Sequence, residues 1–344
     1  MLRADLEKTL NRVWYTQQSN WLKVLLWPFS VVYGVLARHT WRKFAAQRWA
    51  ALPVPLVVVG NIVAGGSGKT PVTQALALAL VARGLKVGIV SRGYGGAVQA
   101  AERVQGDQPL RYGDEPCLLA ATTGCPVAVG RVRADAVRLL CSEFSLDLIV
   151  SDDGLQHASL HRDFELCVVG PRGLGNGCLL PAGPLREPAA RLASVTAVLA
   201  WGQTCAAVPS GVPQWVIHGA HSPLQLLSGN PAPEGTLQAL ALLQSKEKTQ
   251  IIAAAGLAQP ERFYVSLAGA GLQFKTLAVA DHAALSAQQL ARIPPQALLI
   301  VTEKDAVKLR HAGLPAQLQK RIRIVPWRVN LPRDLVNQIA ALAN

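Results

Sequence analysis

The 344-residue sequence predicts an α/β protein built on a mostly parallel sheet. Two observations carry this prediction. Apolar β-type runs alternate with helical segments along most of the chain, from the run at 57–60 to the run at 322–327. The first run also leads into a glycine-rich loop that ends in Gly68-Lys69-Thr70, and an Ala- and Leu-rich helical segment follows. A strand, a glycine-rich loop and a helix in this order form the frame of a phosphate-binding loop.

The glycine-rich loop has the chemistry of a phosphate cradle. Glycines permit positive φ angles and let backbone amides approach phosphate oxygens, and the following helix offers free N–H groups to the same anion. Lys69 can reach the β- and γ-phosphates of ATP, and the Thr70 hydroxyl can bind Mg²⁺. The strict pattern requires glycine where this chain has Val63, but the flanking strand and helix favour nucleotide binding over a plain turn. The predicted nucleotide contacts are Gly65, Gly66, Ser67, Gly68, Lys69 and Thr70.

A second strong signal is an apolar strand at 146–150 that ends in Asp152-Asp153. Downstream of a phosphate-binding loop, a carboxylate at this place holds Mg²⁺ directly or through water. The alternative is a capped turn after a strand. The two motifs together predict a site for ATP and Mg²⁺, with Thr70, Asp152 and Asp153 as metal ligands.

Further polar residues follow predicted strands or open predicted helices, where ligands of open α/β sheets gather. Arg92 and Tyr94 can contact phosphate or substrate, and a tight turn explains them equally well. Arg133 can neutralise developing phosphate charge, or it can lie in an exposed basic turn. Asp114 lies just before a helix at 117–122, where an acid either caps the helix or points a carboxylate at the phosphate site.

The first fifty residues have a different character. Residues 1–20 predict a partly amphipathic helix, and residues 21–37 form an apolar stretch that contains one lysine and Pro28. This stretch is shorter than the about 20 apolar residues that a spanning helix needs, and Pro28 predicts a break or a kink. Tryptophans and a basic flank are typical of the headgroup level. We therefore expect a segment that lies on or dips into a membrane face. The alternative is a pair of helices packed on the protein's own domain.

The formal net charge is +13, which attracts polyanions such as nucleic acid, anionic lipid headgroups or phosphorylated substrates. The charge does not choose among them, but the sequence has no aromatic-interleaved basic patch that would favour nucleic acid. The six cysteines show no metal-site or redox spacing, and no cleavable secretory signal is visible, so we expect a cytoplasmic environment.

Several motifs together resemble the tetraacyldisaccharide 4′-kinases, the lipid A 4′-kinases of Gram-negative bacteria. The motifs, in family order, are Gly60–Pro71, Ser91–Gly95, Gly113–Pro116, Asp152–His157, Leu180–Glu187, Ala255–Phe263, Asp281-His282 and Thr302–Asp305. The resemblance implies transfer of the γ-phosphate of ATP to the 4′-hydroxyl of tetraacyldisaccharide 1-phosphate, which gives lipid IV-A. It places the enzyme at the cytoplasmic face of the inner membrane. Its implied partners are the membrane-embedded anionic glycolipid and the membrane surface, with no nucleic acid and no obligate protein partner.

The resemblance also implies residue roles. Asp114 is the base that accepts the proton of the sugar hydroxyl, paired with His282, and Lys69 completes the predicted catalytic set. The family often has a second histidine or an aromatic residue where this chain has Ala283. Secondary candidates for substrate or metal contacts are Glu115, His157, Arg186 and Glu187.

The predicted organisation has three parts. Residues 1–50 form the membrane-associated helical segment, 51–225 the nucleotide-binding kinase domain, and 226–344 a smaller α/β domain. A Pro-, Gly- and Ser-rich stretch at 204–235 is the expected hinge region, and a single continuous domain is the alternative. A P-loop GTPase or ATPase switch would share the first two motifs. However, Thr302-Glu-Lys-Asp305 lacks the asparagine of a guanine-specificity motif.

Overall fold

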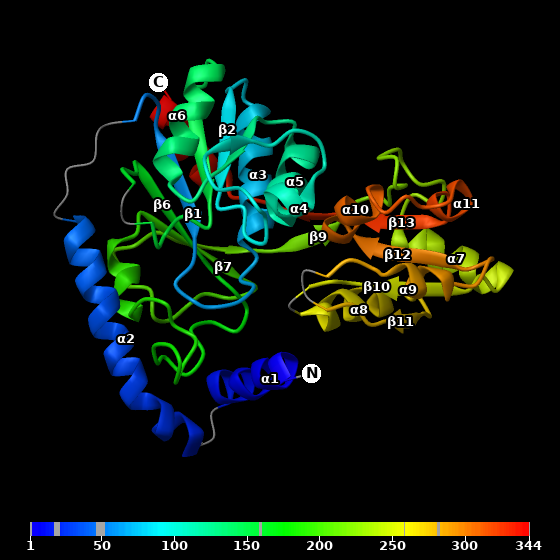
Figure 1. The fold of residues 1–344 in the computed structure, drawn as a ribbon, viewed down its shortest axis with the longest axis horizontal. Coiled ribbons are helices and arrows are strands. Elements are labelled where there is room, and N and C mark those ends of the chain that lie inside the picture. The colour runs from blue at the N-terminus through cyan, green and yellow to red at the C-terminus, as the bar shows by residue number, and fades with distance from the viewer. Residues whose placement is uncertain are drawn as a thin grey trace. The chain divides into compact units, whose positions relative to one another are not determined.

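The structure, a computed structural model, describes residues 2–16, 21–45, 52–157, 160–257, 259–280 and 283–343. The chain forms two compact units (Figure 1). Unit 1 comprises Met1–Arg92, Val132–His218 and Asn330–Asn344, and unit 2 comprises Gly93–Arg131 and Gly219–Val329. Segment 93–131 therefore groups with the later part of the chain, whereas the sequence analysis placed it with the glycine-rich loop. The last fifteen residues group with unit 1.

Within the described residues, unit 1 contains six parallel strands in the order β2-β5-β1-β6-β7-β8. Their bounds are β1 Leu56–Gly60, β2 Val87–Ser91, β5 Leu148–Asp152, β6 Phe164–Val169, β7 Ala197–Trp201 and β8 Gln214–Ile217. Strands β1, β5 and β6 are buried along their whole length, as expected for a parallel sheet covered on both faces. Val59 of β1 pairs with Asp152 of β5. The glycine-rich loop and the two aspartates therefore lie at the carboxyl ends of two adjacent parallel strands. The predicted α/β class is confirmed.

The helices of unit 1 include α3 (Lys69–Val81), α6 (Arg133–Glu143) and α12 (Arg333–Ala340), with short 3-10 helices at Ala189–Ser194 and Ala341–Ala343. Helix α3 begins directly after the glycine-rich loop. Helix α12 contacts α3, and Arg83, just after the end of α3, donates a hydrogen bond to Asn337 Oδ1 at 3.0 Å. This contact ties the C-terminal helix to the nucleotide-binding unit.

Helices α1 (Leu2–Tyr15) and α2 (Trp21–Ala45) belong to unit 1 and contact its 172–186 segment. Trp14 Nε1 donates to the Pro181 carbonyl at 2.9 Å, and Ser30 Oγ donates to the Leu179 carbonyl at 2.9 Å. Helix α2 continues through Pro28, so the expected break does not occur. The contacts of Ser30, just beyond the proline, hold the helix against the unit, because tertiary packing rather than local propensity supplies most helix stability.

One face of α2 is apolar and exposed, and the stretch Trp21–Thr40 is long and apolar enough to cross a membrane by length and composition alone. Only 6% of its most apolar window is buried. The exposed apolar side chains of this helix are Trp21, Val24, Leu25, Trp27, Phe29, Val31, Val32, Val35 and Leu36. So large an exposed apolar surface marks a membrane or protein contact.

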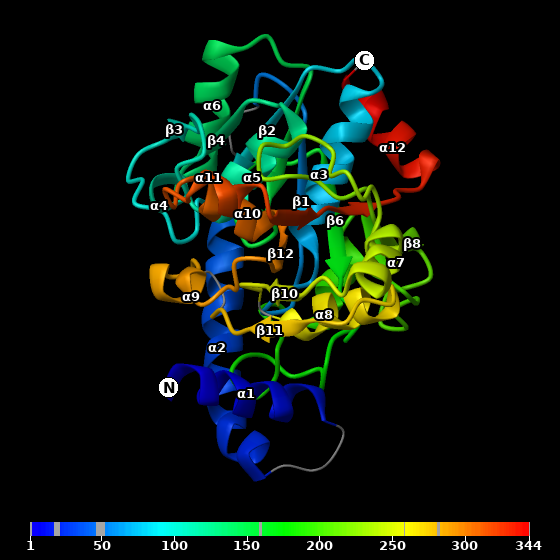
Figure 2. The same ribbon diagram turned by 90° about the vertical axis from the view of Figure 1, so that its right-hand side faces the viewer.

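Unit 2 contains a four-stranded parallel sheet in the order β11-β10-β12-β13. Its strands are β10 Ile251–Ala254, β11 Lys275–Leu277, β12 Leu298–Thr302 and β13 Ile322–Val325. Figure 2 labels three of these strands, β10, β11 and β12. Two antiparallel pairs join β3 (Glu102–Arg103) to β4 (Val127–Val129), and β9 (Gly219–His221) to β14 (Trp327–Val329). The helices are α4 Pro109–Tyr112, α5 Asp114–Thr123, α7 Leu237–Glu247, α8 Pro260–Gly269, α9 Ala287–Ala291, α10 Glu303–Arg310 and α11 Ala316–Gln319. Strand β3 and most of helix α4 lie within the polar stretch 97–111.

Candidate functional site

The glycine-rich loop adopts a conformation that only glycine accommodates well. Gly65 has φ +96° and Gly68, the N-cap of α3, has φ +80°. A Cβ atom at Gly68 would also lie 2.7 Å from the indole Nε1 of Trp201, at the end of β7. The positive φ angles and the close approach of Trp201 explain why the sequence places glycine at these two positions.

Val63 occupies the position where the strict motif has glycine, and the structure shows why a valine fits there. The residue is buried and forms a β-bridge with Leu185, an extended conformation that β-branched residues favour. Asn61 Nδ2 donates to the Val63 carbonyl at 2.7 Å and to Ser67 Oγ at 2.8 Å. An asparagine amide therefore braces this loop from inside.

Lys69 lies at the first position of α3 with its ammonium between two acceptors. Its Nζ is 3.1 Å from Asn61 Oδ1 and 3.1 Å from Asp153 Oδ1. The side chain is 11% exposed, so the charge is largely withdrawn from water. The lysine is thus held at the amino end of the helix, where a phosphate binds.

The two aspartates after β5 have different partners. Asp152 is buried, and its oxygens accept hydrogen bonds from Thr73 Oγ1 at 2.8 Å and from Thr70 Oγ1 at 3.4 Å. Asp153 has φ +50°, an uncommon backbone conformation for a residue other than glycine. Burial raises the pKa of Asp153, but the charges and hydrogen bonds of Lys69 and Arg186 outweigh burial and lower the pKa below its usual range. Asp153 is therefore ionised at neutral pH.

Arg133 and His157 also belong to this cluster. Arg133 is 1% exposed, so the exposed-turn alternative is wrong, and its Nη2 lies 3.5 Å from the Asp152 carbonyl. Burial lowers the pKa of Arg133 to about 10, against the opposing effect of Asp152 and Asp153. Burial, followed by the positive charges of Arg133 and Arg92, lowers the pKa of His157 to about 4. At neutral pH the arginine is charged and the histidine is neutral.

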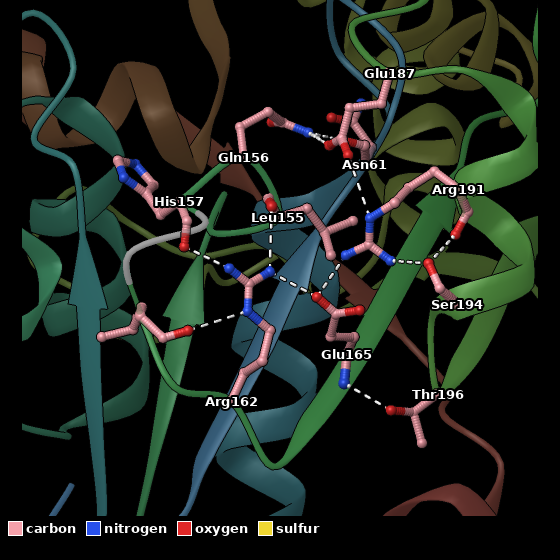
Figure 3. Close-up of polar contacts among 11 residues, drawn as sticks. Asn61, Leu155, Gln156, His157, Arg162, Glu165, Glu187, Arg191, Ser194 and Thr196 are labelled. Carbon is pink, nitrogen blue, oxygen red and sulfur yellow. Dashed lines mark hydrogen bonds and ion pairs between the residues drawn. The ribbon is translucent and has the colours of Figure 1, made fainter. Parts of the chain in front are cut away.

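Gln156, in the turn after β5, contacts Glu187 and Asn61, as Figure 3 shows, and also contacts Arg186. Its Nε2 donates to Glu187 Oε1 at 2.6 Å and to the Asn61 carbonyl at 2.7 Å, and its Oε1 accepts from Arg186 Nη1 at 3.2 Å. Burial raises the pKa of Glu187, although the hydrogen bond from Gln156 and the charge of Arg191 act in the other direction. The Arg186 carbonyl accepts a hydrogen bond from Tyr33 of α2 at 3.0 Å. The apolar helix is thereby linked to a residue that contacts Asp153.

The remaining predicted residues have other surroundings within their own units. Asp114 opens α5 in unit 2, where its Oδ2 lies 2.9 Å from Lys308 Nζ. Lys308, in α10, is buried and also donates to the Ala283 carbonyl at 3.1 Å. Glu115, next to Asp114, is partly buried, Tyr94 is 60% exposed, and Arg92 is exposed. His282 lies outside the described residues.

Two observations show that the residues of unit 1 fit a nucleotide with Mg²⁺. Trp201 Nε1 is buried beside Gly68 and has no acceptor among the described residues, so a donor points toward the loop. The Thr70 hydroxyl and the Asp152 carboxylate converge, and hard oxygen ligands of this kind suit Mg²⁺. No cluster of three His, Cys, Asp or Glu side chains able to hold a metal occurs in the described part of the chain. Mg²⁺ does not require one, because it is usually bound through one or two carboxylates and substrate phosphates.

Sequence reasoning missed several residues of this cluster. Asn61, Thr73 and Gln156 were not proposed as site residues, although all three contact predicted ones. Thr73 carried a readable signal, since residues three apart share a helix face and Thr70 was already predicted to bind metal. Trp201 carried none, because its distance from Gly68 depends on the order of strands in the sheet.

Comparison with known proteins gives a consistent result. A family model described as tetraacyldisaccharide-1-P 4′-kinase matches residues 22–344. The tetraacyldisaccharide 4′-kinase of Alkalilimnicola ehrlichii is 44% identical over 307 residues, which cover 88% of this chain and 87% of that protein. That of Chromobacterium violaceum is 42% identical over 347 residues, with 97% of each chain covered.

The fold comparison agrees with the sequence comparison. The chain resembles a crystal structure of LpxK from Aquifex aeolicus in complex with ATP, with a TM-score of 0.77 and 26% identity. The match covers 94% of this chain and all of that one. The resemblance inferred from the motifs is confirmed, and the chain belongs to the tetraacyldisaccharide-1-P 4′-kinase family.

Proposed function

We propose that this protein transfers the γ-phosphate of ATP to the 4′-hydroxyl of tetraacyldisaccharide 1-phosphate, forming lipid IV-A in lipid A biosynthesis. Family membership, the names of the relatives and the ATP complex of the structural neighbour support this function. One observation carries this proposal: two contacts lie together beyond the carboxyl ends of β1 and β5. Lys69 is held by Asn61 and Asp153, and Thr70 donates to Asp152.

The residues of unit 1 position the phosphates and stabilise their charge, which is most of what a protein contributes to phosphoryl transfer. The amides of 65–70 cradle the phosphate chain, and the Lys69 ammonium binds the β- and γ-phosphates. Arg133 and Arg186 place further positive charge at the same strand ends. Thr70, Asp152 and Asp153 would hold Mg²⁺, which would neutralise charge on the phosphate oxygens.

Asp114 and His282 are the proposed acid–base pair. The sugar hydroxyl needs a proton acceptor within hydrogen-bond reach. The Lys308 ammonium lies 2.9 Å from Asp114 Oδ2 and fixes the position of that carboxylate. Lys308 also donates to the carbonyl of Ala283 at 3.1 Å. Glu115, His157, Glu187, Arg92 and Tyr94 remain candidate contacts to the substrate.

The enzyme is proposed to act at the cytoplasmic face of the inner membrane. The exposed apolar face of α2 supports this location, because it suits contact with lipid acyl chains. The net charge of +13 suits an anionic glycolipid substrate within the bilayer. No nucleic acid and no obligate protein partner enter this proposal.

The test is an incubation of the purified protein with ATP, Mg²⁺ and a 1-phosphorylated tetraacyl disaccharide in detergent micelles. We expect a product with a new phosphate at the 4′ position, detected by mass spectrometry and assigned by NMR. A parallel reaction without lipid measures ATP hydrolysis. Rapid lipid-independent hydrolysis without a phosphorylated lipid would contradict the kinase function and favour a nucleotide-driven switch.

A further inference from the structure

A buried charge group in unit 1 takes no direct part in the proposed reaction. Glu165, the second residue of β6, is 8% exposed. Its Oε1 accepts from Arg162 Nη1 at 2.6 Å and from Arg191 Nη2 at 2.5 Å (Figure 3). The arginine side chains are themselves only 13% and 12% exposed. One carboxylate thus lies between two guanidinium groups in the interior of the nucleotide-binding unit.

Stability alone does not explain such a group. Moving three charges out of water carries a large desolvation cost, and apolar residues of similar volume often serve a protein interior equally well or better. The other N–H donors of the two arginines face residues around the nucleotide site, and these contacts give the group a second role.

Arg162 binds the backbone of the turn that follows the two aspartates. Its guanidinium donates to the carbonyls of Leu155, at 3.2 Å, of Leu160, at 3.3 Å, and of His157. The planar guanidinium offers five donors in fixed directions, which a lysine cannot reproduce. The turn begins at Asp153, whose positive φ angle persists only where surrounding contacts hold it. Arg162 supplies those contacts just beyond that residue.

Arg191 reaches the same site by a second route. Its Nε lies 3.2 Å from Glu187 Oε2, and Glu187 Oε1 accepts from Gln156 at 2.6 Å. Gln156 in turn binds the carbonyl of Asn61, whose side chain accepts from Lys69. Glu165 is the point at which the two routes meet.

We propose that Arg162, Glu165 and Arg191 are positioning residues for phosphoryl transfer, which hold the 154–157 turn and the Glu187–Gln156–Asn61 chain so that Asp153 and Lys69 face the nucleotide. None of the three touches substrate. The inference rests on the proposed function only in taking the glycine-rich loop as the ATP site.

The first experiment uses conservative variants of the full-length protein. Arg162→Lys keeps a cation beside Glu165 but loses the forked contacts to the turn, and Glu165→Gln removes the central charge. We expect each to lower kcat by about 10- to 100-fold, the range that a small misplacement of reacting groups produces. KM for the lipid should stay within about twofold, because neither side chain contacts the lipid in the proposed reaction. Arg111→Lys is the matched control, since Arg111 makes a two-donor contact with Glu102 at an exposed site in unit 2 and should keep wild-type kcat.

The second experiment separates positioning from stability. The triple variant Arg162→Met/Glu165→Leu/Arg191→Met removes all three charges together. We expect its urea midpoint to reach or exceed that of Glu165→Leu alone, because no unpaired buried charge is left, while kcat stays low. Recovery of both stability and kcat in the triple variant would overturn the proposal. Wild-type kcat in Arg162→Lys and Glu165→Gln would overturn it as well.

ATP binding, measured by calorimetry without lipid, distinguishes failure of this inference from failure of the proposed function. In Arg162→Lys, displacement of Lys69 should weaken ATP binding by about 3- to 10-fold. This factor corresponds to the net free energy of one hydrogen bond. If the wild-type protein binds ATP but phosphorylates no lipid, the proposed function fails and ATP affinity alone decides the positioning claim. Unchanged ATP affinity in both conservative variants would then refute it.

Discussion

Each of the two parallel sheets has carboxylates just beyond the end of an inner strand, but the two sets are used differently. In unit 1, Asp153 follows β5 and pairs with the side chains of Lys69 and Arg186. In unit 2, Asp305 follows β12, accepts from the Gly256 amide at 3.0 Å and 3.2 Å, and accepts from Thr302 Oγ1 at 2.6 Å. Gly256 itself lies just after the neighbouring strand, β10.

The partners, rather than the position, separate a site residue from a structural one. Asp305 accepts hydrogen bonds from a backbone amide and from the hydroxyl of its own helix cap. These bonds complete the fold and leave the carboxylate little capacity for a ligand. A carboxylate paired with flexible cations beside a glycine-rich loop can share those cations with phosphate. Burial raises the pKa of Asp305, despite its hydrogen bonds from Thr302 and Gly256, whereas Lys69 and Arg186 outweigh burial and lower the pKa of Asp153.

Asp114 is the acid of unit 2 to which we assign chemistry, and its removal should have the largest effect. Asp114→Asn should lower kcat by about 10²- to 10⁴-fold, the usual contribution of a general base, with ATP affinity retained. Steady-state kinetics and calorimetric ATP binding measure the two quantities. The control is Asp107→Asn, which removes an acid of the same unit paired with Arg310. Equal kcat values for the two variants would remove Asp114 from the mechanism.

Lys69 tests the role of unit 1, where it pairs with Asp153. Lys69→Ala should lower kcat by about 10²- to 10³-fold or more, because it deletes the main cation that meets charge developing on the transferred phosphoryl group. The substitution also removes a cation that pairs with Asp153, so some stability should be lost as well, and kcat is measured at a temperature where circular dichroism shows that both proteins are folded. Lys86→Ala, at an exposed lysine of the same unit, should keep full activity. Lipid phosphorylation by Lys69→Ala at the wild-type rate would remove Lys69 from the mechanism.

Asp305→Ala should damage stability instead of chemistry. The substitution leaves the buried Gly256 amide without its acceptor, which costs about 1–3 kcal/mol of unfolding free energy. Urea unfolding followed by circular dichroism measures this loss. The ATP affinity of the folded variant should equal that of the wild type, whereas Asp152→Ala should weaken activity far more than stability. A selective loss of ATP binding in Asp305→Ala would break the distinction between the two acids.

Trp201→Phe should have a smaller effect. The variant keeps a ring against Gly68 but removes the indole donor that has no acceptor among the described residues. If that donor binds the nucleotide, KM for ATP should rise by about 2- to 10-fold, the net worth of one hydrogen bond, while KM for the lipid stays constant. Trp215→Phe, in neighbouring strand β8, is the matched control. An unchanged KM for ATP would show that the indole only fills space.

The smallest predicted effect is a difference in pH dependence. The pKa of Asp153 is lowered by folding, so its contribution to stability is present above the unfolded pKa and is lost as pH falls through the folded pKa. The pKa of Asp305 is raised, so its contribution is complete below the unfolded pKa and is lost as pH rises through the folded pKa. The unfolding free energy of the wild type minus that of Asp153→Asn should grow as pH rises from 3 to 7. The same difference for Asp305→Asn should shrink over this range. Slopes of the same sign would show that the two carboxylates have similar environments.

The sequence by itself determined the local motifs. The order of strand, glycine-rich loop and helix predicted the phosphate cradle around Lys69, and the apolar run before Asp152 predicted the second strand end. Both depend on neighbours within a few residues of one another, which sequence patterns capture well. The resemblance carried by the motif set predicted the family, which the comparisons confirm.

Only the tertiary structure decided which side chains meet. Strand β6 escaped prediction, because Glu165 interrupts its apolar pattern, and that glutamate joins two arginines at a place no pattern indicates. The grouping of 93–131 with the later part of the chain likewise depends on packing. The physical reason is the same in each case. Hydrogen bonds such as that between Gln156 and Glu187 join residues far apart in sequence, and their partners are set by strand order and register, which local propensity does not encode.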